Sequence, residues 1–259
     1  MDYPIAPDRR AIYPSLSGKR VLVTGGGSGI GGGVVEAFVR QGADVTFFDI
    51  CEEDSQALVD RLSNGNLGPR FEHVDLTDVG ALQAAIAAGI AEGGGYDVLV
   101  NNAANDDRHS LEQVTEAYWN DRFNVNLRHQ FFCSQAVIPA MREKGEGVIV
   151  NLGSISWHLG ITELALYQTA KAAVEGLTRA LARELGPDGI RVSCVIPGNV
   201  RTPRQLKWYT PEGEAEIVAG QCLKGRLVPE DVAAMILFLA SDDARLVTGH
   251  GHFVDAGWR

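Results

Sequence analysis

The sequence predicts an α/β protein with a single doubly wound parallel sheet, the Rossmann fold, covered by helices on both faces. Three observations favour this fold. Short apolar runs rich in β-branched residues alternate with longer helical segments along the chain. A glycine-rich turn follows the first run, and polar residues follow the later ones. We find no linker or repeat, so residues 18–259 are predicted to form one domain after an irregular N-terminal arm at 1–17.

The composition argues against several classes of protein. The 259 residues carry a net charge of −10, whereas a protein that binds nucleic acid usually shows a basic excess. No apolar run approaches membrane-spanning length and the start lacks a signal-peptide core, so we expect no membrane partner and a cytoplasmic location. The four cysteines have neither paired nor metal-like spacing, which predicts free thiols and no metal site.

The first strand is predicted at Arg20–Thr24 and runs into the glycine-rich turn Gly25–Gly33, ahead of a helical pattern. Glycines allow positive φ angles and close approach of the backbone, and a helix N-terminus presents free N–H groups. This combination suits a pyrophosphate. The alternative, a flexible glycine-rich loop, is disfavoured by the segment that comes next.

That segment is a second strand at 44–48, which ends at Asp49, about twenty residues after the glycines, where dinucleotide-binding proteins carry a ribose-binding carboxylate. A carboxylate there accepts hydrogen bonds from a free 2′-hydroxyl and repels a 2′-phosphate. The sequence therefore predicts NAD rather than NADP as the cofactor.

The alternation continues with a helix at about 52–62, a strand at 71–75, a helix at 79–91 and a strand at 96–100. Asp75 has two interpretations of equal weight, contact with the adenine edge or capping of the next helix together with the following acidic residue.

One or two helices are predicted over 111–132, with Asn126 in their middle. Because asparagine competes for backbone hydrogen bonds inside a helix, a buried one needs a polar reason, either local or functional.

The fifth strand, at 147–152, is followed by Ser154 and then by a long amphipathic helix over 164–184. Tyr167 and Lys171 lie four residues apart in its first turns, so both project from one face. A hydroxyl, a phenol and an ammonium thus converge on one point. The triplet alone is a common coincidence, and its place after the fifth strand gives it meaning.

The sixth strand, at 191–196, is followed by an irregular region at 199–226 that interrupts the alternation, and loops of this length are usually lids or binding segments. A helix at 232–239 and a strand at 251–254 close the fold.

This ordered set of motifs resembles the short-chain dehydrogenase/reductase family over residues 18–255. The motifs are Thr24–Gly31, Asn101–Ala103, Asn126, Ser154, Tyr167-x-x-x-Lys171 and Pro197-Gly198. The resemblance implies a nicotinamide cofactor held by Gly25, Ser28, Gly29, Ile30, Gly31, Asp49, Asp75, Leu76, Asn102, Ala103, Tyr167, Lys171, Pro197, Gly198, Val200 and Thr202.

The resemblance also implies that Asn126 holds a water linking Lys171 to solvent and that the chain forms a homotetramer, with Trp258 and Arg259 as possible interface residues. One departure is Ala104, where the family usually has glycine; its methyl group beside the cofactor is either harmless or narrows the pocket.

A narrower resemblance is to the sugar-oxidising members of the family, carried by segments 105–109, 125–129, 153–160, 207–215 and 255–259. Those enzymes oxidise the C1 hydroxyl of a cyclic pentose, such as D-xylose, to the lactone. A sugar pocket needs several fixed polar groups and an aromatic face. The predicted substrate residues are Asn105, Ser154, Trp157, His158, Tyr167, Gln168, Asn199, Arg201 and Trp208, although Arg201 is also interpretable as a solvated charge and Trp208 as core.

The chemistry of this oxidation assigns a role to each member of the triplet. An isolated tyrosine has a pKa of about 10 and is a poor base, but a lysine ammonium and a positive nicotinamide favour its phenolate. Tyr167 is therefore the predicted base, Lys171 the group that lowers its pKa and holds the ribose, and Ser154 the donor to the reacting oxygen.

Two alternatives stay open. One is a dehydrogenase of the same fold for L-arabinose, another aldose or a sugar acid, because fold and catalytic residues do not name the substrate. The other is an NAD-binding sensor or scaffold without turnover, against which the intact triplet counts.

Overall fold

The computed structural model describes residues 10–63, 68–206 and 209–258, and its centre is a seven-stranded sheet in the order β3-β2-β1-β4-β5-β6-β7. Every neighbouring pair of strands is parallel, which confirms the predicted doubly wound sheet. The strands are β1 Arg20–Thr24, β2 Asp44–Asp49, β3 Arg70–His73, β4 Val98–Asn101, β5 Gly147–Leu152, β6 Ile190–Pro197 and β7 Gly251–Val254.

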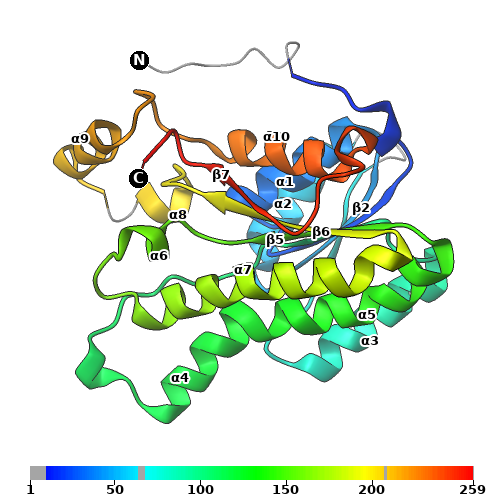
Figure 1. The fold of residues 1–259 in the computed structure, drawn as a ribbon, viewed down its shortest axis with the longest axis horizontal. Helices are drawn as coiled ribbons and strands as arrows, with labels where there is room; N and C mark the ends of the chain where they lie inside the picture. The colour runs from blue at the N-terminus through cyan, green and yellow to red at the C-terminus, as the bar shows by residue number, and fades with distance from the viewer. Residues whose placement is uncertain (1–9, 64–67, 207–208, 259) are drawn as a thin grey trace.

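Helices cover both faces of the sheet, as Figure 1 shows. Helices α1 and α10 pack together on one face, and α3, α5 and α7 cover the other. The helices are α1 Gly29–Arg40, α2 Glu52–Leu62, α3 Val79–Gly93, α4 Glu116–Phe123, α5 His129–Lys144, α6 Ser156–Leu159, α7 Ala165–Leu185, α8 Pro203–Leu206, α9 Pro211–Gly220 and α10 Pro229–Ala240.

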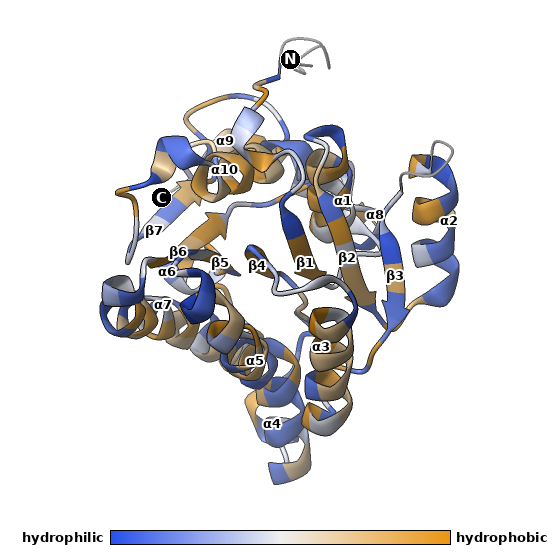
Figure 2. Cartoon of the chain, turned by 90° about the vertical axis from the view of Figure 1, so that its right-hand side faces the viewer, coloured by the Kyte–Doolittle hydropathy of each residue, from blue (hydrophilic) through white to orange (hydrophobic). Residues whose placement is uncertain are grey.

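The central strands are apolar on both sides because each side faces a layer of helices. In Figure 2 the colour of hydrophobic residues covers much of β1 and β2. All six residues of β5 are buried. Along β1, Val21 and Val23 belong to the cluster with α1 and α10, whereas Leu22 belongs to the cluster with α3 and α5. This alternation of side chains gives the sheet two cores and fixes its register.

The site is positioned where the strand order reverses, between β1 and β4. The chain leaves these two strands toward opposite faces, so a crevice opens at their carboxyl ends. Thr24 at the end of β1 pairs with Asn101 at the end of β4, and Asn101 pairs in turn with Asn151 on β5. The Asn101 amide also donates to the Asn151 side chain at 2.9 Å, which ties these strand ends together.

The helix predicted to end near residue 132 instead continues as α5 to Lys144, after a π-helical turn at Asn124–Arg128. It passes through Pro139, whose lost hydrogen bond lies on the exposed side of the helix, where water can replace it. Region 199–226 contains α8 and α9, and the short helix α6 was not predicted.

Leu16 is only 1% exposed, so the described part of the N-terminal arm packs on the domain. No helix among residues 10–63, 68–206 and 209–258 is long and apolar enough to cross a membrane.

Candidate active site

The glycine turn presents the N-terminus of α1 to the crevice. Gly25 has a φ of +64°, and a Cβ on Gly31 would lie 1.9 Å from the Gly25 carbonyl oxygen, so only glycine fits there. Ser28 caps α1 without a side-chain hydrogen bond, which leaves the first N–H groups of the helix, at Gly29 and Ile30, for a ligand. These features fit the pyrophosphate of a dinucleotide.

Asp49 ends β2 beside this turn. Its carboxylate accepts hydrogen bonds from Gly27 N at 2.8 Å and from Cys51 N at 2.9 Å, so its orientation is fixed. A carboxylate oxygen accepts more than one hydrogen bond, so a ribose hydroxyl can still be bound. The geometry fits the predicted role.

Asp75 and Leu76 follow β3. Asp75 accepts hydrogen bonds from the backbone N–H of Thr77 at 2.8 Å and from its hydroxyl at 2.7 Å, while Asp78 caps α3. Leu76 is 7% exposed and packs in the core beside α3. The Asp75 carboxylate thus serves a local turn, and its contact with adenine stays a prediction.

The loop after β4 is held against β1. Asn102 donates to the carbonyl oxygens of Thr24 and Gly25 at 3.0 and 2.8 Å, and the Thr24 hydroxyl accepts from Ala103 N. Ala104, the departure from the family pattern, is not among the non-glycine residues with positive φ. Its methyl group therefore introduces no backbone strain.

Ser154 after β5 and Tyr167 and Lys171 on α7 meet as predicted. The Ser154 hydroxyl forms a hydrogen bond with the Tyr167 phenol and lies 2.9 Å from the Ser156 hydroxyl. The Lys171 ammonium lies 5.6 Å from the centre of the Tyr167 ring and donates to the carbonyl oxygen of Leu152 at 2.7 Å. Hydroxyl, phenol and ammonium therefore belong to one site.

The electrostatics of this triplet differ from the expectation. Burial, together with the negative charge of Asp106, raises the pKa of the Tyr167 phenol, while the Ser154 hydrogen bond and the Arg204 charge act in the opposite direction. Burial lowers the pKa of Lys171 to about 8. The Lys171 ammonium donates its hydrogen bond to the Leu152 carbonyl and not to the Tyr167 oxygen. Ionisation of Tyr167 to the phenolate therefore needs further positive charge close to the phenol.

Asn126 lies in the π-helical turn and is fully buried. Its side chain accepts a hydrogen bond from Asn105 N at 2.8 Å and donates to the Asn105 carbonyl oxygen at 3.0 Å. The polar reason for this residue is thus to clamp the loop after β4. Its predicted role in holding a water stays a prediction.

The segment after β6 closes the crevice from the other side. A Cβ on Gly198 would lie 2.7 Å from the Cα of Asp255, so glycine allows the close approach of β6 to the chain after β7. Val200 and Thr202 are buried, and Thr202 lies beside Gly29 at the start of α1. The Pro197 carbonyl oxygen accepts from Ile155 N, one residue after Ser154.

Two predicted sugar contacts each have a ring nitrogen engaged by Glu175. Trp157 Nε1 donates to Glu175 on α7 at 2.7 Å, and His158 Nε2 lies 3.0 Å from the same oxygen. Their rings lie 3.7 Å apart, and His158 contacts Phe253 on β7. At Trp157 a sugar would therefore meet the ring surface rather than a free N–H group.

The remaining predicted substrate residues are spread around the site. Gln168 donates to the Ile161 carbonyl oxygen, and Asn199 accepts from Tyr209 at 2.5 Å and from Arg226 at 2.9 Å. Arg201 is exposed, and Trp208 lies outside the described residues.

Sequence reasoning missed several polar residues at the site, because each is placed by contacts with a distant segment. His129 is fully buried and lies 3.0 Å from the Ala103 carbonyl oxygen, and burial and the Lys171 charge lower its pKa to about 3. The others are Asp106 after β4 and Arg204, Gln205 and Tyr209 in the 199–226 region. Only their proximity to motif residues along the chain gave a signal.

Comparison with known proteins agrees with this geometry. The family model described as enoyl-(acyl carrier protein) reductase matches residues 25–259. A D-xylose 1-dehydrogenase of Caulobacter vibrioides is 64% identical over 96% of this chain and 99% of its own length. A probable galactose dehydrogenase of Rhizobium meliloti is 48% identical over 95% of this chain and 96% of its own.

Among solved structures, a short chain dehydrogenase/reductase family protein superposes with a TM-score of 0.82 and 34% identity, over 94% of this chain and 98% of that one. The chain therefore belongs to the short-chain dehydrogenase/reductase family, oxidoreductases that act on a CH–OH group with a nicotinamide cofactor.

Proposed function

We propose that this protein is an NAD-dependent aldose 1-dehydrogenase that oxidises the C1 hydroxyl of a cyclic pentose, D-xylose, to the lactone. The observation that carries the proposal is the 64% identity to a D-xylose 1-dehydrogenase over nearly the whole of both chains. The Ser154, Tyr167 and Lys171 constellation supports it, because those groups suit removal of a proton from an alcohol.

The reaction removes a hydride from C1 and a proton from its hydroxyl, and the bound nicotinamide supplies the hydride acceptor. Ser154 holds the reacting oxygen by a hydrogen bond, and the Tyr167 oxygen takes the proton as the carbonyl of the lactone forms. The Lys171 ammonium, 5.6 Å from the centre of the Tyr167 ring, and the positive nicotinamide would together favour the phenolate, and Lys171 would also hold the ribose of the cofactor.

NAD as the cofactor is part of the proposal and rests on Asp49, whose fixed carboxylate would repel a 2′-phosphate. Steady-state kinetics with both cofactors test this point. We expect a higher kcat/KM with NAD; a preference for NADP would refute the assignment.

The proposed activity is tested with a panel of aldoses and NAD, following NADH at 340 nm. We expect oxidation of D-xylose and loss of nearly all turnover in Tyr167→Phe, with NAD binding unchanged. Retention of most turnover in that variant would contradict the assignment of the base.

A second candidate substrate is suggested by the galactose dehydrogenase relative. The same panel separates the candidates: a higher kcat/KM for galactose or L-arabinose than for D-xylose would move the assignment to that sugar. If no NADH formed with any aldose, the result would favour the alternative function, an NAD-binding sensor or scaffold without turnover.

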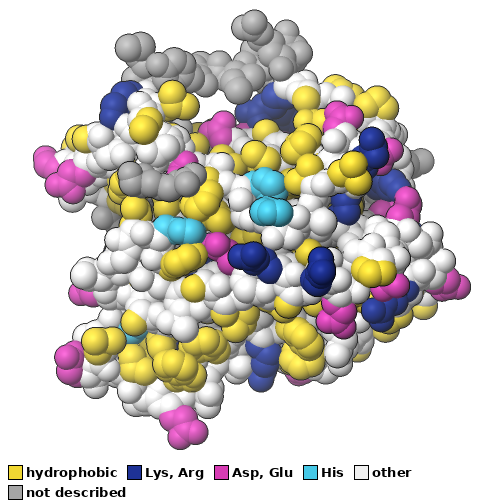
Figure 3. All heavy atoms as spheres, in the orientation of Figure 1, with side chains coloured by type: hydrophobic (Ala, Val, Ile, Leu, Met, Phe, Trp, Pro, Cys, Tyr) yellow, Lys and Arg dark blue, Asp and Glu magenta, His cyan; other side chains and the backbone are white. Residues whose placement is uncertain are grey.

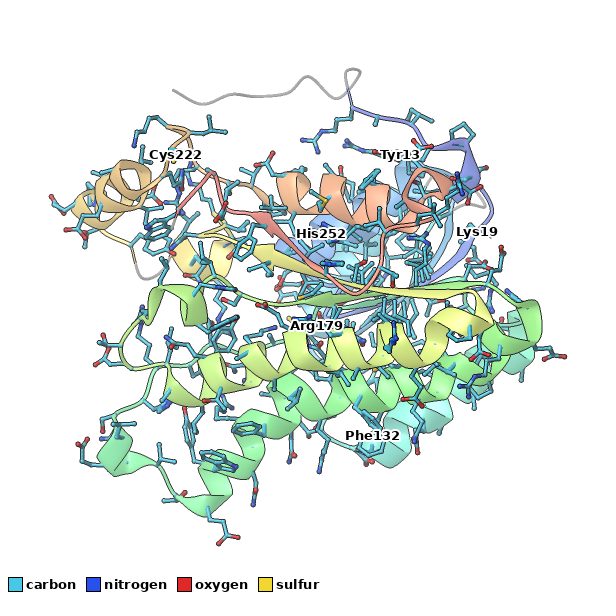
Figure 4. The ribbon with its side chains drawn as sticks, viewed as in Figure 1. Tyr13, Lys19, Phe132, Arg179, Cys222 and His252 are labelled. Carbon is cyan, nitrogen blue, oxygen red and sulfur yellow. The ribbon has the colours of Figure 1, made fainter. Side chains whose placement is uncertain are left out.

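We also propose that the protein is a cytoplasmic homotetramer. An apolar groove of about 420 Å³ between α4, α5 and α7 supports self-association, and Figure 3 shows hydrophobic side chains gathered on this part of the surface. The groove includes Phe131, which is 42% exposed, and Phe132, which Figure 4 shows on the side of α5 away from the sheet. Sedimentation that gives a monomer would remove this part of the proposal.

A further inference from the structure

Asp106 lies in the loop after β4 and faces α8. Arg204 Nε lies 3.2 Å from one carboxylate oxygen of Asp106, and Gln205 Nε2 donates to the other at 2.9 Å. Two segments 99 residues apart in the sequence are joined by the hydrogen bond to Gln205. Asp106 therefore ties the loop after β4 to the 199–226 region, in which Thr202 lies beside Gly29 at the start of α1.

The orientation of the Asp106 carboxylate is fixed in advance. The Gln205 amide nitrogen donates to Asp106, and the Gln205 amide oxygen lies 2.8 Å from the Tyr209 hydroxyl, so both polar atoms of this amide have a partner. The preceding residue, Asn105, is clamped through its backbone by the buried Asn126. Because both the side chain of Asp106 and the backbone next to it are held in place, the carboxylate can bind a ligand without losing further conformational freedom.

The charge of Asp106 acts on both members of the catalytic pair. After burial, it is the next cause that raises the pKa of Tyr167, and it also raises that of Tyr209. At Lys171, where burial lowers the pKa, the charge of Asp106 acts in the opposite direction. These three residues belong to α7 and to the 199–226 region. Asp106 therefore acts electrostatically on the catalytic pair from the loop after β4, where its side chain is 33% exposed.

We propose that Asp106 is a substrate-binding residue that accepts hydrogen bonds from hydroxyls of the sugar ring other than the one at C1. The inference rests on the proposed aldose dehydrogenase activity. An ionised carboxylate offers about four acceptor positions, and α8 uses one on each oxygen. The remaining acceptor positions suit two neighbouring ring hydroxyls, whereas an apolar alcohol would cover them and leave them unused.

The neighbouring Asp107 provides a matched control. It also pairs with Arg204, at 2.7 Å, and with Arg122, at 3.1 Å, but its side chain is 51% exposed. Removing its charge weakens the same contact to α8 without removing the acceptor that we assign to the sugar.

The first test measures steady-state kinetics of the wild type, Asp106→Asn and Asp107→Asn with D-xylose and NAD. We expect Asp106→Asn to raise KM for D-xylose by roughly ten- to a hundredfold, as for a lost hydrogen bond to a charged group, with KM for NAD unchanged. We expect Asp107→Asn to stay within about threefold of the wild type. An unchanged KM for D-xylose in Asp106→Asn would overturn the assignment.

The second test uses D-xylose analogues that lack one ring hydroxyl at C2, C3 or C4. In the wild type, the loss of a hydroxyl bound by Asp106 raises KM; in Asp106→Asn, the same loss has little further effect, because residue and hydroxyl form one interaction. Fully additive losses for all three analogues would overturn the assignment. A wild type that oxidises no aldose refutes the proposed function and this inference together, whereas wild-type turnover with unaffected variants refutes Asp106 alone.

Discussion

At the scale of single residues, Lys171 faces two opposing demands. The residue is only 1% exposed, and burial favours the neutral amine, so the pKa of Lys171 is lowered to about 8. The proposed mechanism needs the charged form beside Tyr167. A pKa of about 8 still leaves most molecules charged at neutral pH, so the site keeps its positive charge at a cost in folding stability.

This cost makes a prediction for Lys171→Met. Because the unfolded amine, with a pKa of 10.5, holds its proton more tightly than the folded one, the wild type gains stability relative to the variant as the pH rises from about 8 to 10.5. The gain should reach about 3 kcal/mol in the free energy of unfolding. Urea unfolding of both proteins at several pH values measures it, and free energies that change in parallel would contradict the burial of a charged amine.

At the scale of elements, the turn from β1 into α1 depends on the close approach of two backbones. A Cβ on Gly31 would meet the Gly25 carbonyl oxygen at 1.9 Å and the Asn102 side-chain nitrogen at 2.6 Å. Neither contact can relax without moving the turn, because Asn102 is itself bonded to the Thr24 and Gly25 carbonyls. The turn and the loop after β4 are thus one unit.

We therefore expect Gly31→Ala to lower the unfolding midpoint and to abolish measurable NAD binding, followed by calorimetric titration. Gly176→Ala is the matched control, because this glycine lies in α7 with nothing within 4 Å of an added Cβ. The control should gain roughly 0.5–1 kcal/mol of stability, since alanine is the better helix former. Normal NAD binding by Gly31→Ala would show that the turn tolerates the methyl group.

Among the elements, the strands could be predicted from the sequence and the full length of α5 could not. The strands and their parallel order followed from apolar runs and from the glycine turn, because buried strands and close backbone approaches restrict residue type locally. The extension of α5 through Pro139 did not follow, because whether a proline ends a helix depends on the solvent exposure of the lost hydrogen bond.

At the candidate site, the sequence indicated the residues that carry a motif, and Ser154, Tyr167 and Lys171 do come together. It did not indicate Asp106, because that residue is defined by its contacts with α8, 99 residues later. Nor did it show that Glu175 engages a ring nitrogen of Trp157 and one of His158. Such partners are set by the assembled fold and leave no local pattern.

At the scale of the whole molecule, one buried imidazole links acid stability to the site. His129 begins α5, lies 3.0 Å from the Ala103 carbonyl oxygen and is fully buried. Since a carbonyl oxygen only accepts, Nε2 carries the proton of the neutral ring. Burial, reinforced by the positive charge of Lys171, lowers the pKa of His129 from 6.5 to about 3, so the folded state strongly resists a second proton on this ring.

The sign of the resulting pH dependence follows from linkage. Above pH 6.5 the His129 ring is neutral in both the folded and the unfolded state. Below pH 6.5 the ring binds a proton in the unfolded state, whereas in the folded state it stays neutral down to about pH 3. The wild type should thus lose about 3 kcal/mol of stability relative to His129→Gln between pH 6.5 and pH 4. Urea unfolding at half-unit pH steps measures the difference, with His250→Gln, which replaces an exposed imidazole, as the control. If wild type and His129→Gln declined in parallel while the control behaved like the wild type, the acid sensitivity of the fold would have to originate in other groups.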